Sequence, residues 1–279
     1  MSARRPTAPV ITFLSDYGLA DEFVGVCHSV IARRCPQAHV IDLTHAVPPQ
    51  DVHWGALVLA SAAPYLPAGV HLAVVDPGVG ASGARARRAV ALRAGDDGHV
   101  LVGPDNGLLM PAAELLGGAS AAVEISRSPE HLPEMSATFH GRDLFAPVAA
   151  ALAAGAQLSE VGEAMDPGAL CRLDVPQARV CGDALHTRVL RTDRFGNAIL
   201  DARAAQLSEL GAQPGDAVAV HHARGVSVAR LVRAFADVAE GELLIYEDSQ
   251  RLLSLAVNRG SAAELLALAP GQELEVHRA

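Results

Sequence analysis

The stretch Val10-Ile11-Thr12-Phe13-Leu14-Ser15-Asp16-Tyr17-Gly18 begins the pattern that decides the fold. Its first five residues form a short, mostly apolar run, typical of a buried strand, and polar residues and a glycine end it. The alternation continues with a helix expected over residues 22–34, a strand over 40–43, a helix over 51–65 and a strand over 70–75. This rhythm predicts an α/β domain with a mainly parallel sheet and helices on both faces.

Three polar residues stand just past the ends of these strands: Asp16, His45 and Asp76. In α/β sheets of this type, ligands bind in the crevice beyond the carboxyl ends of the strands. We therefore expect the three side chains to lie along one rim of the sheet.

The chain after Asp76 changes character. Residues 89–93 and 99–103 are expected to form two strands of a hairpin, joined by Gly95-Asp96-Asp97-Gly98. Helices are expected over residues 108–116 and 143–154. Pro147 then falls in the first turn of the second helix, where its missing N–H is tolerated.

A second domain is expected after a stretch without clear periodicity, residues 157–177. Beyond it, short β-like runs suggest a small antiparallel barrel or sandwich. These runs are residues 185–190, 198–200, 217–220, 226–232, 243–246 and 252–257. The predicted organisation is an α/β catalytic domain over residues 1–165 and a small all-β, barrel-like domain over residues 178–279.

The composition excludes several classes of protein. Half of the 279 residues are hydrophobic, which is ample for a core, and the formal net charge of −9 disfavours nucleic acid or an anionic membrane as a partner. The four cysteines have no C-x-x-C spacing, which fits reduced thiols and gives no zinc site. The apolar runs are too short for a signal peptide or a membrane span. We expect a cytoplasmic protein that acts on a small molecule.

Two short strings carry most of the chemical information, Val75-Asp76-Pro77-Gly78-Val79-Gly80 and Thr138-Phe139-His140-Gly141-Arg142-Asp143. Each places an ionisable side chain beside glycine, where backbone can approach a ligand closely. The arginines Arg85, Arg87 and Arg88 lie between them. An aspartate, an arginine and a histidine at one pocket would hold and polarise water, so we expect an enzyme.

Two other kinds of site compete with this interpretation. Gly78-Val79-Gly80-Ala81-Ser82-Gly83 matches the G-x-G-x-x-G pattern of dinucleotide-binding turns, but a hairpin is expected after it, where such a turn requires a helix. The aspartates and histidines of the first half could chelate two metal ions for phosphoester hydrolysis. Because none of the usual metal-ligand spacings is present, we predict no metal site.

Seven motifs follow one another along nearly the whole chain. They are Ser15-Asp16-Tyr17-Gly18, Leu43-Thr44-His45 with Pro48-Pro49-Gln50-Asp51, Asp76-Pro77-Gly78-Val79-Gly80, Pro104-Asp105-Asn106-Gly107-Leu108, Phe139-His140-Gly141-Arg142-Asp143, Asp193-Arg194-Phe195-Gly196-Asn197 and Ala256-Val257-Asn258-Arg259-Gly260. In this order they resemble the S-adenosyl-L-methionine hydrolases (adenosine-forming), the water-using relatives of the fluorinase and chlorinase.

The resemblance implies in-line attack of water at ribose C5′ of S-adenosylmethionine, giving adenosine and methionine without a metal or organic cofactor. It also implies a homotrimer with active sites at subunit interfaces. Asp76, an arginine and His140 would handle the water. The implied substrate contacts are Asp16 on the ribose diol, Phe195 and Phe235 flanking the adenine, Asn258 on the adenine edge, and Asp193, Asn197 and Ser249 near the methionine end.

One departure from the family concerns the arginine, because the loop over residues 81–86 is longer than usual. Alignment on the arginine pair makes Arg87 the catalytic candidate, with Arg85 as the alternative. A carboxylate at the nucleophile site repels halide, so water is the expected nucleophile. A non-catalytic adenosine or S-adenosylmethionine sensor and a metal-dependent hydrolase are the competing functions.

Overall fold

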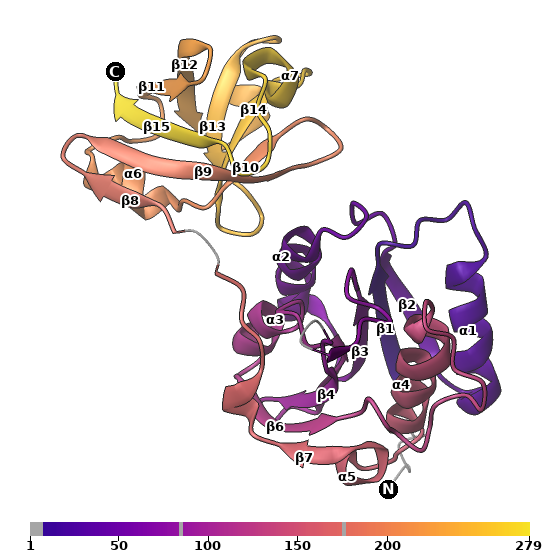
Figure 1. Ribbon diagram of the computed structural model, residues 1–279. Helices are drawn as coiled ribbons and strands as arrows, with labels where there is room; N and C mark the ends of the chain where they lie inside the picture. Colours follow the sequence, from indigo (N-terminus) through magenta and orange to yellow (C-terminus); the bar gives the residue numbers. More distant parts are fainter. Residues whose placement is uncertain (1–7, 84–85, 175–176) are drawn as a thin grey trace, which may run out of the picture. The chain divides into compact units, whose positions relative to one another are not determined.

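The computed structural model describes residues 8–83, 86–174 and 177–279, which are drawn in Figure 1. They divide into two compact units, residues 1–173 and residues 174–279. Each unit has its own apolar core, so each is described by itself.

The first unit is built on a seven-stranded sheet in the order β2-β1-β3-β5-β4-β6-β7. Strands β2, β1, β3, β5 and β6 run in one direction, and β4 and β7 run against them. The bounds are β1 Val10–Ser15, β2 His39–Thr44, β3 Gly69–Val74, β4 Ala89–Ala94, β5 His99–Pro104, β6 Ala119–Glu124 and β7 Glu163–Met165. The predicted mainly parallel sheet is confirmed.

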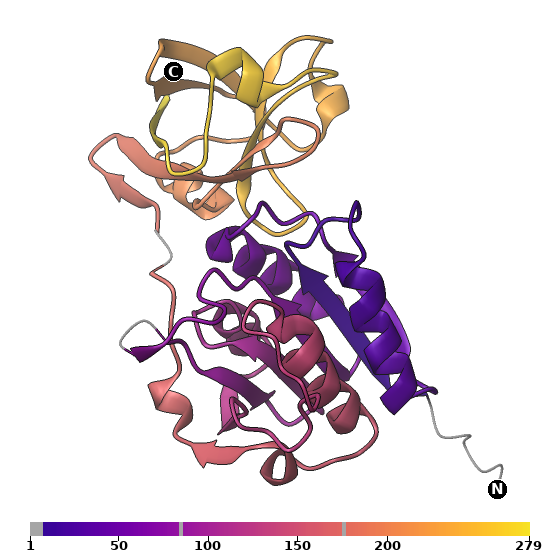
Figure 2. The same ribbon diagram turned by 45° about the vertical axis from the view of Figure 1, so that its right-hand side comes forward.

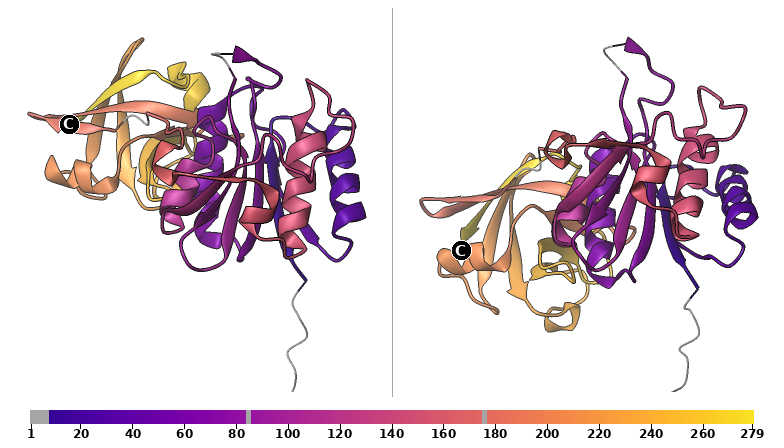
Figure 3. Two further views of the ribbon diagram at one scale, coloured as in Figure 1. Left: turned by 60° about the horizontal axis from the view of Figure 1, so that its bottom comes forward. Right: turned by 90° about the horizontal axis from the view of Figure 1, so that it is seen from below.

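Helices cover both faces of this sheet. Figure 2 shows α1 (Phe23–Arg34) beside α4 (Ala146–Ala153), which pack on β1, β3 and β4 through Ile31, Phe13 and Val148. On the other face, α2 (Val52–Ala62) and α3 (Met110–Leu115) pack through Leu59 and other apolar side chains. Figure 3 shows the sheet between the two helix layers. Burial on both faces explains why β1 and β3 are almost wholly apolar.

Local signals in the sequence account for several helix ends. The carboxylate of Asp51 accepts a hydrogen bond from Trp54 N at 2.9 Å and caps α2. Pro147 lies in the first turn of α4, as expected. A π-helical turn, Gly141–Phe145, precedes α4 and contains the end of the second chemical string, while His140 stands directly before it. The remaining short elements of this unit are Ala63–Tyr65, α5 Leu158–Val161 and Pro167–Ala169.

The second unit is a barrel closed by pairing of β9 with β10, in the order β10-β14-β13-β12-β11-β15-β9, with β8 added on β9. Its strands are β8 Arg179–Cys181, β9 Ala184–Thr192, β10 Ala198–Leu200, β11 Ala217–His222, β12 Gly225–Val232, β13 Leu243–Glu247, β14 Leu253–Val257 and β15 Glu273–Arg278. Short helices α6 (Ala204–Glu209), Phe235–Asp237 and α7 (Ala262–Leu266) connect them. The barrel-like all-β prediction is confirmed.

Two details of the barrel differ from the sequence prediction. β12 pairs with β13 in parallel, so the barrel is not wholly antiparallel, because the connection between them crosses to the other end of the barrel. β15 was not predicted, although its burial alternates along the strand. Among the described helices of both units, none has the length and hydropathy needed to cross a membrane.

Candidate active site

Asp76 stands directly past the end of β3, where the chain makes a tight turn. The side-chain amide of Asn106 donates to Val75 O at 2.9 Å, which holds the strand end in place. Gly80 has a φ of +73°, and a Cβ there would lie 2.2 Å from Ala137 O. Only glycine fits this position, which brings the turn against the loop that leads to His140.

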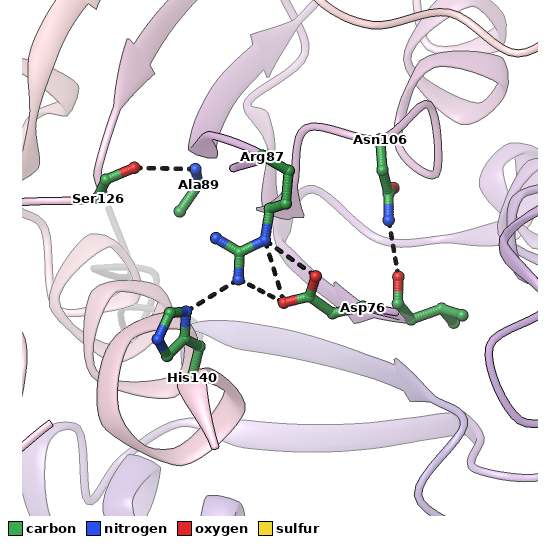
Figure 4. A network of polar contacts seen from close by, with 7 residues as sticks. Asp76, Arg87, Ala89, Asn106, Ser126 and His140 are labelled. Atoms are coloured by element: carbon green, nitrogen blue, oxygen red, sulfur yellow. Dashed lines mark hydrogen bonds and ion pairs between the residues drawn. The ribbon is translucent and has the colours of Figure 1, made fainter. Parts of the chain in front are cut away.

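Arg87 joins Asp76 to His140 (Figure 4). Arg87 Nε donates to Asp76 Oδ1 at 2.9 Å and to Oδ2 at 3.1 Å, and Nη2 contacts Oδ2 as well. The same Nη2 lies 2.9 Å from His140 Nδ1. The Asp76 side chain is 6% exposed and that of Arg87 12%, so this ion pair is screened little by solvent. We refer to the three residues as the Asp76–Arg87–His140 network.

The contact with Arg87 determines the protonation state of His140. A guanidinium has donors and no acceptor, so Nδ1 must accept, and the proton of the neutral imidazole sits on Nε2. Burial lowers the pKa of His140, and the positive charge of Arg87 lowers it further, against the opposing effect of Asp76. His140 is therefore neutral at neutral pH.

Asp16 lies in the same electrostatic environment. Its Oδ2 accepts from the backbone N of Gln50 at 2.8 Å, and Gln50 has a left-handed φ of 68°. Burial raises the pKa of Asp16, the hydrogen bond from Gln50 lowers it, and the charge of Asp76 raises it. The two carboxylates thus lie within electrostatic reach of each other at the strand ends, where the sequence predicted a rim of polar groups.

Sequence reasoning assigned no role to Tyr17 or Phe145. A Cβ at Gly141 would lie 2.1 Å from the Tyr17 hydroxyl, so Gly141 makes room for that ring beside His140. The guanidinium of Arg87 lies 5.3 Å above the Phe145 ring, an attractive cation–π contact. Tyr17 lies within one of the sequence motifs and Phe145 lies two residues after another. This closeness to the motifs is the signal in the sequence that could have identified them as site residues.

Arg88 and Arg142 pair with carboxylates other than that of Asp76. Arg88 donates from Nε to Asp105 Oδ2 at 2.8 Å instead. Arg85, the alternative catalytic arginine, lies outside the described residues. Arg142 pairs with Asp143, whose carboxylate is fully buried and accepts from Ser136 N at 2.7 Å. The glycine-rich stretch after Asp76 leads to strand β4, unlike a dinucleotide-binding turn.

In the barrel, Asp193 and Asn197 bond chiefly to each other. Asp193 Oδ1 accepts from Phe195 N at 2.8 Å and from Asn197 N at 3.0 Å, and Oδ2 accepts from Asn197 Nδ2 at 2.8 Å. These bonds close the turn between β9 and β10. Gly196, with a φ of +79°, completes it.

Phe195 belongs to this turn, and the other predicted substrate contacts of the barrel lie outside it. Phe195 is 70% exposed and Phe235, which packs against Tyr246, is 38% exposed. Asn258 donates from Nδ2 to Val238 O at 2.9 Å, and Ser249 is exposed in the turn after β13. The sequence analysis did not single out Arg191 on β9. Burial lowers the pKa of Arg191, whereas the nearby negative charges of Asp193 and Asp248 raise it.

Comparison with known proteins shows the family of this chain. The model of the SAM hydroxide adenosyltransferase N-terminal domain matches residues 11–162, and that of the C-terminal domain matches residues 187–275. The chain belongs to the SAM hydroxide adenosyltransferase family. The first matched segment lies in the α/β unit and the second in the barrel, so both units match the family.

Relatives within and beside the SAM hydroxide adenosyltransferases match along nearly the full chain. An (R)-S-adenosyl-L-methionine hydrolase of Salinispora tropica is 52% identical over 272 residues, 96% of this chain and 97% of the relative. The protein of that name from Thermus thermophilus is 42% identical, covering 95% and 98%. A fluorinase of an Actinoplanes species is 29% identical, covering 97% and 98%.

Solved structures support the same fold. A conserved protein of Thermotoga maritima superposes with a TM-score of 0.88 at 37% identity, over 96% of this chain and 100% of that one. A conserved protein of Thermus thermophilus gives a TM-score of 0.73 at 39% identity, covering 97% and 100%. This chain is thus similar in fold to both proteins over nearly its full length.

Proposed function

We propose that this chain hydrolyses S-adenosyl-L-methionine to adenosine and L-methionine by attack of water at ribose C5′. Family membership and the hydrolase relatives support the substrate. The observation that carries the proposal is the Asp76–Arg87–His140 network at the end of β3, where ligands bind in sheets of this kind.

The reaction asks little of the protein beyond positioning and polarising one water. The oxygen lone pair forms the C5′–O bond as the C5′–S electron pair returns to the sulfonium sulfur, which leaves as a neutral thioether. The water then loses one proton. The protein must hold the water in line with the C–S bond and exclude competing solvent.

The network assigns a role to each member. Arg87 Nη2 contacts both Asp76 and His140 Nδ1, so His140 would hold the guanidinium against Asp76, beside which the water would lie (Figure 4). His140 Nδ1 is occupied by Arg87 and cannot take the proton. Asp76 Oδ1 accepts one bond from Arg87 and keeps a lone pair, so Asp76 is the proposed proton acceptor.

The same charges select against a halide nucleophile and make a catalytic metal unnecessary. The carboxylate of Asp76 would repel an anion at the water position. Arg87 already supplies the positive charge between Asp76 and His140 that a metal would supply elsewhere. We therefore propose that the reaction needs no cofactor.

The barrel residues complete the proposal. Asp16 would hold the ribose diol, Phe195 and Phe235 would flank the adenine, and the remaining contacts would be made by Asp193, Asn197, Ser249 and Asn258. Phe195 is 70% exposed in the single chain, and aromatic residues are enriched at surfaces that another subunit covers. We propose a cytoplasmic homotrimer with the active sites at its subunit interfaces, which sedimentation equilibrium would test by mass.

Product analysis tests the function. The purified chain, incubated with S-adenosylmethionine, EDTA and chloride, should give equal amounts of adenosine and methionine by chromatography. Loss of activity in EDTA would point to the metal-dependent alternative. Tight binding of S-adenosylmethionine without products would identify a sensor instead.

A further inference from the structure

A second cluster of reactive side chains lies away from the Asp76–Arg87–His140 network. His28 of α1, Asp42 of β2 and His45, just past β2, each offer a ligand atom, and these atoms lie within 4.8 Å of one another. His28 Nε2 is 2.8 Å and His45 Nε2 is 3.0 Å from the same oxygen, Asp42 Oδ1. Figure 1 shows α1 and β2 next to each other at the edge of the sheet.

His45 is the unusual member of this cluster. Its side chain is 2% exposed, yet within the described part of the chain Nε2 has no hydrogen-bond partner. Asp42 Oδ1 lies 3.0 Å away, in an ion-pair contact that does not meet the geometry of a hydrogen bond. A buried polar nitrogen without a partner is costly and rare. A cation in line with Nε2 would satisfy it.

The surroundings of His45 hold the imidazole as metal-binding histidines are held. Nδ1 lies 2.7 Å from Ser15 Oγ, which also accepts from Tyr17 N at 3.3 Å. With Nδ1–H donated to this hydroxyl, Nε2 carries the lone pair, which is the form of imidazole that binds a metal ion. The Phe13 ring packs 4.6 Å from the His45 ring and 6.0 Å from the His28 ring. A fixed tautomer and an apolar backing are the usual outer shell of a metal ligand.

We propose that His28, Asp42 and His45 bind one divalent transition-metal ion of the zinc type. Two imidazoles and a carboxylate suit such an ion, with water as the fourth ligand. Zinc–ligand bonds of about 2.0–2.1 Å in a tetrahedron place ligand atoms roughly 3.3 Å apart, so the two distances between an imidazole nitrogen and Asp42 Oδ1 need open by only a few tenths of an ångström.

The ion would act on structure rather than on the reaction, and this inference does not depend on the proposed function. His45 O accepts from Gly18 N at 2.8 Å, and Nδ1 of the same residue bonds to Ser15. Both partners flank Asp16. An ion bound at His45 would therefore fix the segment that carries Asp16 and tie α1 to the edge strand β2.

Titration of the full-length, tag-free chain with Co²⁺, followed by visible absorption, tests the site, with Zn²⁺ added afterwards to displace the probe. The variants are His28→Ala and Asp42→Asn, whose side chains are partly exposed, and both are checked for folding by circular dichroism. His39→Ala, an exposed histidine on the same strand, is the matched control.

The expected result is one Co²⁺ per chain with four-coordinate spectra in the wild type and in His39→Ala. The two ligand variants should bind at least about tenfold more weakly, since removing even an outer-shell partner costs roughly 10- to 100-fold in affinity. Zn²⁺ should also raise the unfolding temperature of the wild type and not that of the ligand variants. No saturable Co²⁺ binding, or equal binding by wild type and ligand variants, would overturn the proposal.

Discussion

The α/β unit and the barrel position their candidate residues in opposite ways. In the α/β unit, Arg87 bonds to Asp76 and to His140, which are 11 and 53 positions away in the chain. In the barrel, Asp193 bonds to Phe195 and Asn197, two and four positions away. The first arrangement exists only in the folded unit, whereas turn chemistry alone explains the second.

This difference bears on how strongly geometry supports each assignment. The Asp76–Arg87–His140 network joins three distant segments, and its nearly buried ion pair costs desolvation free energy. Groups held in this way are common in active sites. A self-satisfied Asp–Asn turn needs no ligand to explain it. The role of the α/β unit therefore rests on its own contacts, while the role of the barrel rests on family membership and on exposed rings.

The largest effect should come from removing Arg87. Arg87→Gln takes away both the partner of Asp76 and that of His140, and we expect kcat to fall on the order of 10²- to 10⁴-fold. Adenosine affinity should change little. Arg172→Gln, which removes an exposed ion pair with Glu114 in the same unit, is the control. Rates of product formation at saturating substrate, measured by chromatography, give kcat for both variants. A wild-type kcat in Arg87→Gln would show that the network of the α/β unit is not needed for the reaction.

The next effect concerns stability of the α/β unit. His71 is fully buried between Thr12 and His99, with hydrogen bonds of 2.9 Å to each, and burial lowers its pKa from 6.5 to about 4. Between these two pH values His71 is protonated in the unfolded chain but neutral in the folded one. The free energy of unfolding therefore falls as the pH drops from about 6.5 to about 4. The expected loss is about 3 kcal/mol.

Urea unfolding, followed by fluorescence of Trp54, the single tryptophan, reports this unit. In His71→Gln the stability should depend less on pH across the same window. An unchanged pH dependence would show that His71 is not the titrating group.

A smaller effect should separate binding from stability in the barrel. Phe195→Ala should weaken substrate or adenosine binding by roughly ten- to a hundredfold, the usual worth of one base–aromatic stack. Because the ring is exposed, the free energy of unfolding should change by less than about 0.5 kcal/mol. Leu265→Ala, another exposed apolar residue of the barrel, should leave both unchanged. Calorimetric titration checks this, and equal affinities of the two variants would count against the stacking role.

The smallest effect is a pair of opposite pKa shifts at His140. Arg87 lowers the pKa of this imidazole and Asp76 raises it. Arg87→Gln should therefore raise the His140 pKa, and Asp76→Asn should lower it further below its ordinary value. NMR titration of the imidazole protons measures both, and shifts of the same sign would contradict the network geometry.

Much of the fold follows from local patterns, and the failures have physical causes. The strand–helix alternation up to Val74 and the Gly95–Gly98 turn are short-range signals, and they placed β1 to β5. β6 was missed because the alanine-rich Ala119–Glu124 has no marked strand preference. β15 alternates Glu273, Leu274, Glu275 and Val276 with clear period two and could have been found.

The candidate site was predictable as a set of motifs but not as a geometry. Asp76 and His140 could be chosen from their glycine neighbours and the family resemblance. The position of Arg87 between them depends on its contacts with Asp76 and His140, which no local pattern specifies. The His28–Asp42–His45 cluster was invisible for the same reason, since it needs helix α1 beside strand β2.

The central claim is that this chain transfers a water oxygen to C5′ of S-adenosylmethionine through the Asp76–Arg87–His140 network. Reaction in ¹⁸O-enriched water with EDTA, followed by mass spectrometry of the adenosine, tests it most directly. The account predicts adenosine carrying one ¹⁸O on the ribose, equimolar methionine, and loss of this product in Arg87→Gln. Unlabelled adenosine, a different nucleoside product or an undiminished Arg87→Gln variant would contradict it.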